Sequence, residues 1–230
     1  MDREGEEGME KKEVSLTITD AYRQKFPGMS FGIGTIQDCT YFERSEAFKL
    51  YKREFLRKIR RKANLSLVEQ RINLYDQFFK AWSYLCPLPG HLKRVIDMGF
   101  PIVNLYIDTH IMAETGHGIL MAIQDLGRFV GSWRLDLAQE GEVFEGVSGR
   151  ELHCKEGEII LRDDSGIVCS LFQGPDSRTR VGEKTKDIVV YVFTAPGISE
   201  EPVIEGIKMA LQTLEEFGKG KEPWLHIFRP

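Results

Sequence analysis

The sequence predicts an α+β fold. Apolar residues recur at helical spacing over 45–115, segments typical of β-strands follow over 130–194, and one more helical pattern covers 199–218. Helices and strands that are segregated along a chain favour an α+β architecture over an alternating, doubly wound one. The 230 residues are 42% hydrophobic and 29% charged, which is an ordinary globular composition and enough chain for a domain with its own core.

The first thirteen residues differ from the rest of the chain. They carry six acidic and three basic side chains and almost no apolar ones. We therefore expect residues 1–13 to form a disordered acidic tail and residues 14–230 to form a single domain.

Two strands are expected early in this domain, over 14–18 and 29–36. The second contains Gly32 and Gly34, a pair that resembles the start of a dinucleotide-binding loop. Position 37 is Gln instead of the third glycine, and no helical pattern follows, so a strand is the favoured interpretation.

A basic helix is expected after Ser45. Apolar residues recur every three or four positions from Phe48 to Ile59, which places them on one face. The other faces are basic, because residues 49–62 hold eight Lys or Arg and a single acidic residue. Asn64 is expected to break this helix.

Further helices are indicated by capping signals and periodicity. Ser66 and Glu69 fit a capping box that would start a second helix, which runs through Trp82. An amphipathic turn is expected over 91–98. A largely buried helix is expected over 102–115, with Gly116 as its C-terminal stop.

The strands of the second half are expected over 130–137, 158–162, 167–172 and 188–194. The turn from Asp163 to Gly166 joins the middle two as a hairpin. Ser199 is expected to cap a last helix, which Gly218 ends.

Composition excludes several classes of protein. The net charge of −4 argues against a chain wholly committed to polyanions, although a local basic patch remains possible. The four cysteines form no CxxC pair, so neither a disulfide framework nor a zinc site is indicated, and we expect no metal and no cofactor. No stretch is apolar enough to span a membrane, which favours a cytoplasmic protein without a membrane partner.

The basic segment 49–62 has two interpretations. It is either a solvated surface helix or a nucleic-acid contact, because its cations are almost unopposed by carboxylates in a net acidic chain. The candidate nucleic-acid ligands are Lys49, Lys52, Arg53, Arg57, Arg60 and Arg61.

The polar segment 173–187 also has two interpretations, as plain surface or as a recognition loop. Arg178 offers a planar fork to a carboxylate or phosphate, while Asp176 and Thr179 can fix hydroxyl or amino groups. His110 and His117 near the end of the buried helix could each act as a base, but a solvated or satisfied histidine is commoner.

A family resemblance adds to this reading. The residues that carry it are Ala113 to Gly116, the strand from Val130 to Asp136 with Gly141 to Phe144 after it, the hairpin Gly157 to Gly166, and Asp176 to Val181 with Thr185 and Asp187. From about residue 102 to 193 the chain resembles the tRNA-binding, editing B3/B4 module of the phenylalanyl-tRNA synthetase β subunit, and more closely the free-standing versions of that module.

This resemblance implies a three-layer fold of sheets with flanking helices and a trans-acting aminoacyl-tRNA deacylase that binds the acceptor end of tRNA. It implies catalytic roles for Asp176, Arg178 and Thr179. The implied substrate-binding residues are Asp108, Thr109, Glu114, Gln173, Ser177, Thr185 and Asp187. The chain departs from the pattern at Tyr106 and Thr109, where free-standing relatives carry Asp and Asn, and the histidine of the synthetase site falls near Leu120.

Two other functions stay open. The same fold could bind tRNA, an amino acid or a nucleoside without catalysis, because fold does not guarantee chemistry. The chain could also be a protein-interaction domain. The deacylase hypothesis requires a pocket where the segment 173–187 meets the end of the buried helix. The sequence assigns neither the amino acid that such a pocket would bind nor the oligomeric state.

Overall fold

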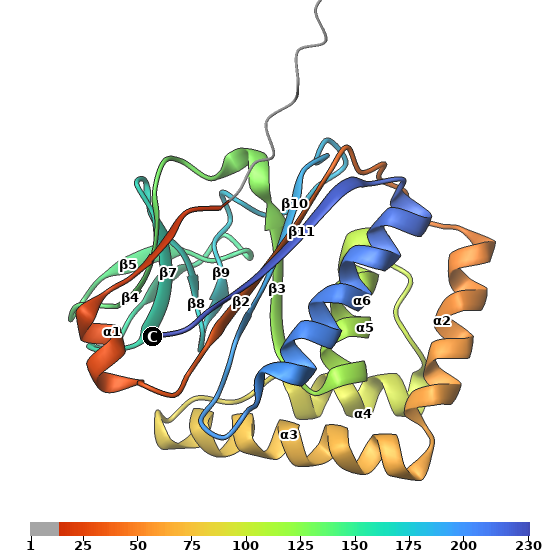
Figure 1. Ribbon diagram of the computed structural model, residues 1–230, viewed down its shortest axis with the longest axis horizontal. Coiled ribbons are helices and arrows are strands. Elements are labelled where there is room, and N and C mark those ends of the chain that lie inside the picture. Colours follow the sequence, from red (N-terminus) through yellow and green to blue (C-terminus); the bar gives the residue numbers. More distant parts are fainter. Residues whose placement is uncertain (1–13) are drawn as a thin grey trace, which may run out of the picture.

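The computed structural model describes residues 14–230 and has the predicted α+β fold. The predicted tail, residues 1–13, lies outside the described residues. Two β-sheets lie face to face, and helices α5 (Leu105–His117) and α6 (Glu200–Gly218) cover the outer face of the second sheet (Figure 1). The layers are therefore sheet, sheet and helices, as expected, and one main hydrophobic core runs through them.

The first sheet has five strands in the order β1-β4-β7-β8-β9. They are β1 (Leu16–Ile18), β4 (Trp133–Leu137), β7 (Ile159–Asp163), β8 (Gly166–Ser170) and β9 (Gly174–Pro175). Strand β1 pairs with β4 in parallel, and the other pairs are antiparallel. The hairpin predicted at Asp163 to Gly166 is confirmed, because β7 and β8 pair across this turn.

The second sheet has four antiparallel strands in the order β11-β2-β10-β3. They are β2 (Phe31–Gln37), β3 (Leu120–Asp125), β10 (Ile188–Phe193) and β11 (Lys221–Phe228). Strand β2 lies between β10 and β11, so the start and the end of the chain meet in this sheet. Sequence patterns indicated β2 and β10 but missed β3 and β11.

The glycines of β2 allow a helix to lie directly on the strand. A Cβ at Gly32 would come within 2.6 Å of Val203, and one at Gly34 within 2.4 Å of Ile207, both on α6. Close packing of helix on sheet therefore explains this Gly-x-Gly pair, which lies inside a strand and not in a nucleotide-binding loop.

Helices α2 (Glu46–Ile59), α3 (Lys62–Ala81) and α4 (Leu88–Met98) pack against α5. The short helix α1 (Asp20–Lys25) lies apart from them, against β4 of the first sheet (Figure 1). Ser45 caps α2 as predicted, since its hydroxyl accepts the backbone N–H of Phe48. The predicted start of α3 at Ser66 is wrong, because extended backbone at Arg61 lets the helix begin at Lys62 and carry Ser66 in its second turn.

The predicted end of α5 is also wrong by one half-turn. Gly116 lies inside the helix, where a Cβ would meet the ring of Phe55 at 2.5 Å. Gly118 ends the helix instead, with φ 65° and ψ 40°, the left-handed conformation that glycine adopts without strain. A short 3₁₀ turn at Leu126–Arg128 and the small ribbon of β5 (Val143–Glu145) and β6 (Glu151–His153) complete the elements of the described chain.

Candidate functional site

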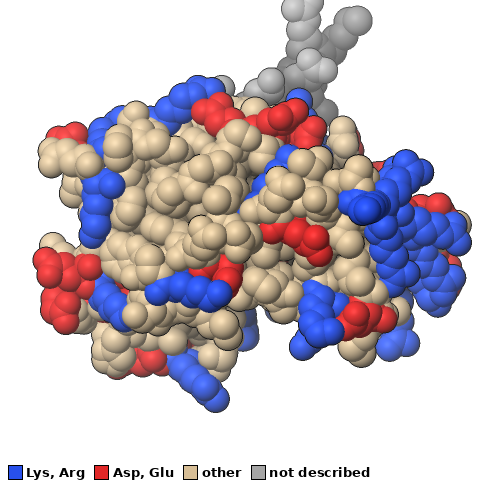
Figure 2. All heavy atoms as spheres, turned by 90° about the horizontal axis from the view of Figure 1, so that it is seen from below, with Lys and Arg blue, Asp and Glu red and all other residues tan. Residues whose placement is uncertain are grey.

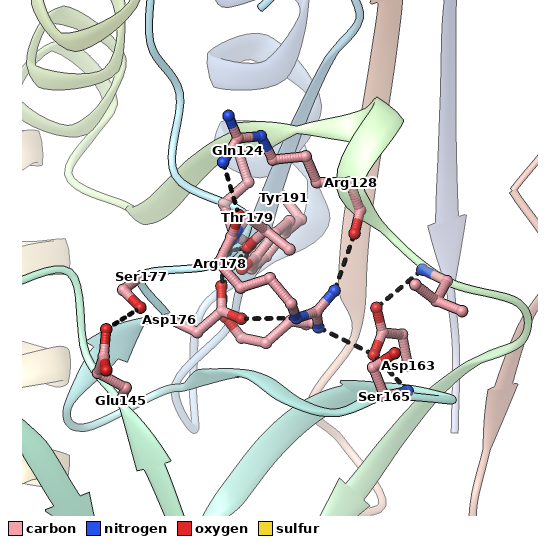
Figure 3. Close-up of polar contacts among 12 residues, drawn as sticks. Gln124, Arg128, Glu145, Asp163, Ser165, Asp176, Ser177, Arg178, Thr179 and Tyr191 are labelled. Carbon is pink, nitrogen blue, oxygen red and sulfur yellow. Dashed lines mark hydrogen bonds and ion pairs between the residues drawn. The ribbon is translucent and has the colours of Figure 1, made fainter. Parts of the chain in front are cut away.

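The polar segment 173–187 begins at β9 and ties the two sheets together. Asp176 Oδ1 accepts the backbone N–H of Thr179 at 3.0 Å, the hydroxyl of Thr179, and Nε2 of Gln124 at 3.2 Å (Figure 3). Tyr191 of β10 donates its hydroxyl to Oε1 of Gln124. All four side chains are buried, and burial raises the pKa of Asp176. These groups satisfy one another between the sheets.

Arg178 is held by the protein itself. Its Nη2 donates to Oδ1 of Asp163 at 3.0 Å, its Nη1 donates to the carbonyl of Arg128 at 2.8 Å, and its Nε lies 3.4 Å from Oδ2 of Asp176 (Figure 3). The planar fork that we considered for a ligand is thus engaged by the β7–β8 turn and by the 3₁₀ turn after β3.

The other predicted residues of this segment also have protein partners. The hydroxyl of Ser177 donates to Glu145, and that of Thr185 donates to Oδ2 of Asp125 at 2.6 Å. Asp187 accepts the backbone N–H of Asp38 through Oδ1 at 3.3 Å. These contacts fix the segment against β5, the end of β3 and the loop after β2.

The predicted residues of α5 lie apart from these contacts. Asp108 forms a buried ion pair with Lys52 of α2 and accepts the backbone N–H of Val103 at 3.0 Å. Thr109 is buried, and its hydroxyl has no hydrogen-bond partner among the described residues. Glu114 is buried near the end of the helix beside two histidines.

A cavity of about 300 Å³ opens where the two sheets meet. It is lined by 120–122 of β3, by 169–175 of β8 and β9, by Phe193 of β10, and by Leu85 and Pro87 before α4. The start of the polar segment and the strand directly after α5 therefore border the same cavity. Gln173 is the predicted site residue that lines it.

The polar wall of this cavity is organised around Glu158. This buried carboxylate accepts Nε2 of Gln173 at 3.0 Å and the hydroxyl of Ser170 at 3.0 Å through Oε2, and the hydroxyl of Tyr84 through Oε1. Gln173 Nε2 also donates to the carbonyl of His153 at 3.1 Å, whereas no described residue donates to its Oε1. These two hydrogen bonds of Nε2 thus hold the Gln173 amide in place and leave its Oε1 without a donor in 14–230.

Sequence reasoning missed most of the lining. Leu85, Leu120 and Phe172 look like ordinary core residues in the sequence, although the side chain of Leu85 is exposed. The sequence did point to one of them, Leu120, because the resemblance aligns the site histidine of the synthetase module with a position near it.

The basic surface is centred on α2. Lys and Arg side chains gather at the end of the molecule where this helix lies, on the right in Figure 2. A groove of about 370 Å³ runs between α2 and the segment 97–102, and Lys49, Arg53 and Arg60 line it. The groove also exposes Met98 and Ile102, so it combines cations with apolar surface.

The predicted nucleic-acid ligands of α2 differ in availability. Lys52 is buried by Asp108, while Arg57 pairs with Glu54 on the helix surface. Arg53 and Arg61 are exposed and form no ion pair with residues 14–230. Lys49 lies 3.5 Å from an exposed glutamate, and Arg60 donates to the carbonyl of Ile96. Of the six predicted ligands, Arg53 and Arg61 are therefore the most open to a phosphate.

Comparison with known proteins indicates the fold. No protein family matches the chain, and no curated protein matches its sequence. Its structure is similar to the crystal structure of an N-terminal fragment of the phenylalanyl-tRNA synthetase β-subunit from Pyrococcus horikoshii, with a TM-score of 0.50 and 13% sequence identity. The match covers 92% of this chain and 50% of the fragment, so the chain spans half the length of that structure. At this identity the similarity establishes the fold alone.

The described part of the chain lacks a membrane-spanning helix and a metal-binding cluster. None of the helices within 14–230 is both long and apolar enough to cross a membrane. Among the same residues, no three His, Cys, Asp or Glu side chains are grouped so that they could hold a metal ion.

Proposed function

We propose that this chain binds the charged 3′ end of a tRNA and hydrolyses the aminoacyl ester in trans. The observation that carries the proposal is the cavity of about 300 Å³ between β3 and the 169–175 segment. Its volume is at the lower end of ligand pockets, which suits an amino-acid side chain better than a large cofactor. The similarity in fold to a fragment of a tRNA synthetase subunit supports the same choice.

The walls of the cavity suit an amino acid with an apolar side chain. Leu120, Ala122 and Phe193 provide apolar surface, while the free Oε1 of Gln173 can accept a hydrogen bond from the amino group of the substrate. Glu158 and the carbonyl of His153 fix the Gln173 amide, so little ordering is needed on binding.

The chemistry demands little of the protein, because an aminoacyl ester is already activated. Positioning the ester beside one water in a restricted site supplies much of the rate increase. In this proposal Asp176, Arg178 and Thr179 act by holding the wall at Gly174–Pro175, since their bonds connect it to β3 and to the β7–β8 turn.

The basic groove is proposed as the contact for the tRNA backbone. Lys49 and Arg53, which line the groove, and the exposed Arg61 offer cations to phosphates. Lys52 acts structurally through its pair with Asp108. The exposed apolar side chains Met98 and Ile102 lie beside these cations and can contact riboses or bases.

A deacylation screen tests the proposal. The purified protein should shorten the lifetime of at least one of the twenty aminoacyl-tRNAs. Leu120→Trp fills the cavity and should abolish this activity, while Val143→Trp on exposed β5 adds the same ring elsewhere and should not. Thermal denaturation of both variants checks that they fold.

Two outcomes would count against the proposal, the first against hydrolysis and the second against the cavity as its site. If all twenty aminoacyl-tRNAs keep their background half-lives while a gel shift persists, the chain binds tRNA without catalysis. If Leu120→Trp deacylates as fast as the unmodified protein, the cavity is not the site.

A further inference from the structure

A carboxylate flanked by two histidines lies next to the cavity. Glu114 of α5 accepts Nδ1 of His91 through Oε2 at 2.8 Å, and its Oε1 lies 3.2 Å from Nε2 of His110. The Glu114 side chain is 2% exposed, whereas that of His91, on α4, is 35% exposed. Both histidines therefore reach solvent, His91 more than His110, whose side chain is 20% exposed, and the carboxylate does not.

This cluster is joined to the wall of the cavity through Met121. The backbone N–H of Met121 donates to Oε1 of Glu114 at 3.2 Å, and the Met121 carbonyl lies 2.8 Å from Nε2 of His110. Met121 lines the cavity, and so does Pro87, which lies one helical turn before His91 and accepts its backbone N–H at 3.0 Å. His91 therefore does not itself line the cavity but lies beside it, one helical turn from Pro87 and bonded to the carboxylate that holds Met121, so it would act on a water at this edge.

The charge on Glu114 decides the tautomer of His91. Burial disfavours the ionised carboxylate, but the interactions with His110 and then His91 outweigh it and lower the pKa of Glu114 to about 2. An ionised carboxylate only accepts hydrogen bonds, so the proton between the two groups belongs to Nδ1 of His91. In the neutral ring Nε2 then carries a free lone pair, and it makes no hydrogen bond to any residue in 14–230.

We propose that His91, oriented by Glu114, is the general base for ester hydrolysis in this cavity. The inference rests on the proposed deacylase function. Nε2 removes a proton from water as the water oxygen bonds to the ester carbonyl carbon, and the carbonyl oxygen becomes an oxyanion. When the bond from this carbon to the ribose oxygen breaks, His91 returns the proton to that oxygen. The products are the free amino acid and the tRNA 3′-hydroxyl.

Few other groups near the cluster titrate in the working range. His110 shares the carboxylate, and although burial opposes its charge, Glu114 outweighs that effect and raises the pKa of His110. Tyr75 on α3 and Cys86 before α4 face the same carboxylate, and burial raises the pKa of both, that of Cys86 to about 12. Both therefore stay neutral near pH 7.

The test compares His91→Ala with His226→Ala, a control that removes an exposed histidine from β11 on the far edge of the second sheet. With the aminoacyl-tRNA that the unmodified protein hydrolyses fastest, His91→Ala should lower the protein-dependent rate at least about 100-fold, as loss of a general base does. The rate of the unmodified protein should rise with pH, because only a neutral imidazole accepts a proton from water, and this rise should vanish in His91→Ala. Added imidazole should restore part of the activity, which a merely structural defect would not allow.

The outcomes are separable. If the unmodified protein hydrolyses no aminoacyl-tRNA, the proposed function fails, and the role of His91 fails with it. If it is active and His91→Ala keeps its rate and pH profile, only the assignment of His91 is overturned. A loss of rate that imidazole does not restore, with an unchanged pH profile for the remaining activity, also overturns it.

Discussion

The buried pair Lys52–Asp108 allows a sharp test of the structure. Only 5% of the lysine side chain and 1% of the aspartate side chain are exposed. Removing one partner of such a pair leaves an uncompensated charge in the interior and costs about 3–5 kcal/mol. We therefore expect Lys52→Met, which keeps a stem of similar length, to lower the free energy of unfolding by that amount and the Tm by about 6–20 °C.

The double variant Lys52→Met/Asp108→Asn separates the charge from the packing. Asn keeps an oxygen for the backbone N–H of Val103 but removes the buried charge, so the double variant should recover at least half of the loss. Urea denaturation of the unmodified protein, of Lys52→Met and Asp108→Asn alone, and of the double variant gives the coupling energy between the two side chains. A cost under about 1 kcal/mol for Lys52→Met, or additive effects in the double variant, would refute a desolvated pair and would return Lys52 to the candidates for RNA contact.

Three further predictions concern packing, pH and charge. Gly116→Ala should destabilise the protein by about 1–3 kcal/mol, because the new Cβ would lie 2.5 Å from the Phe55 ring. Gly90→Ala, in open space on α4, should stabilise it by about 0.5–1 kcal/mol, and equal effects of the two variants in urea denaturation would contradict this reasoning. Burial lowers the pKa of His117 from 6.5 to about 4, so the unfolded chain binds its proton more readily and stability should fall as the pH drops through this range. His117→Gln should flatten that part of the stability curve, and an unchanged slope would disprove the assignment. Arg53→Glu should weaken tRNA binding and reduce the salt slope by about 1, while Arg134→Glu on β4 should do neither; equal losses in filter binding would exclude the α2 groove.

The parts of the fold that depend on local interactions were predictable from the sequence. Ser45 signals the start of α2 because its cap bonds a residue three positions away, and the turn from Asp163 to Gly166 encodes its own hairpin. Strands β3 and β11 were missed because neither alternates clearly, and each exists only through pairing with β10 or β2. Such pairing is not visible in a local window.

The candidate site was predictable only in part, for the same reason. Gln173 was found because it begins a segment rich in polar side chains, and it does line the cavity. Arg178 and Lys52 looked available in the sequence, but partners distant in the chain hold them. His91 was overlooked because nothing near it in the sequence reveals Glu114, which lies 23 positions further along.

The position of β2 has a consequence for biosynthesis. This strand, made from residues 31–37, is hydrogen-bonded on one side to residues 188–193 and on the other to residues 221–228. A nascent chain must therefore hold residues 31–37 incompletely paired until residues 221–228 have been made. Premature termination before codon 221 would leave one side of that segment open to pairing with another molecule, so truncated products should aggregate more readily than the full-length polypeptide.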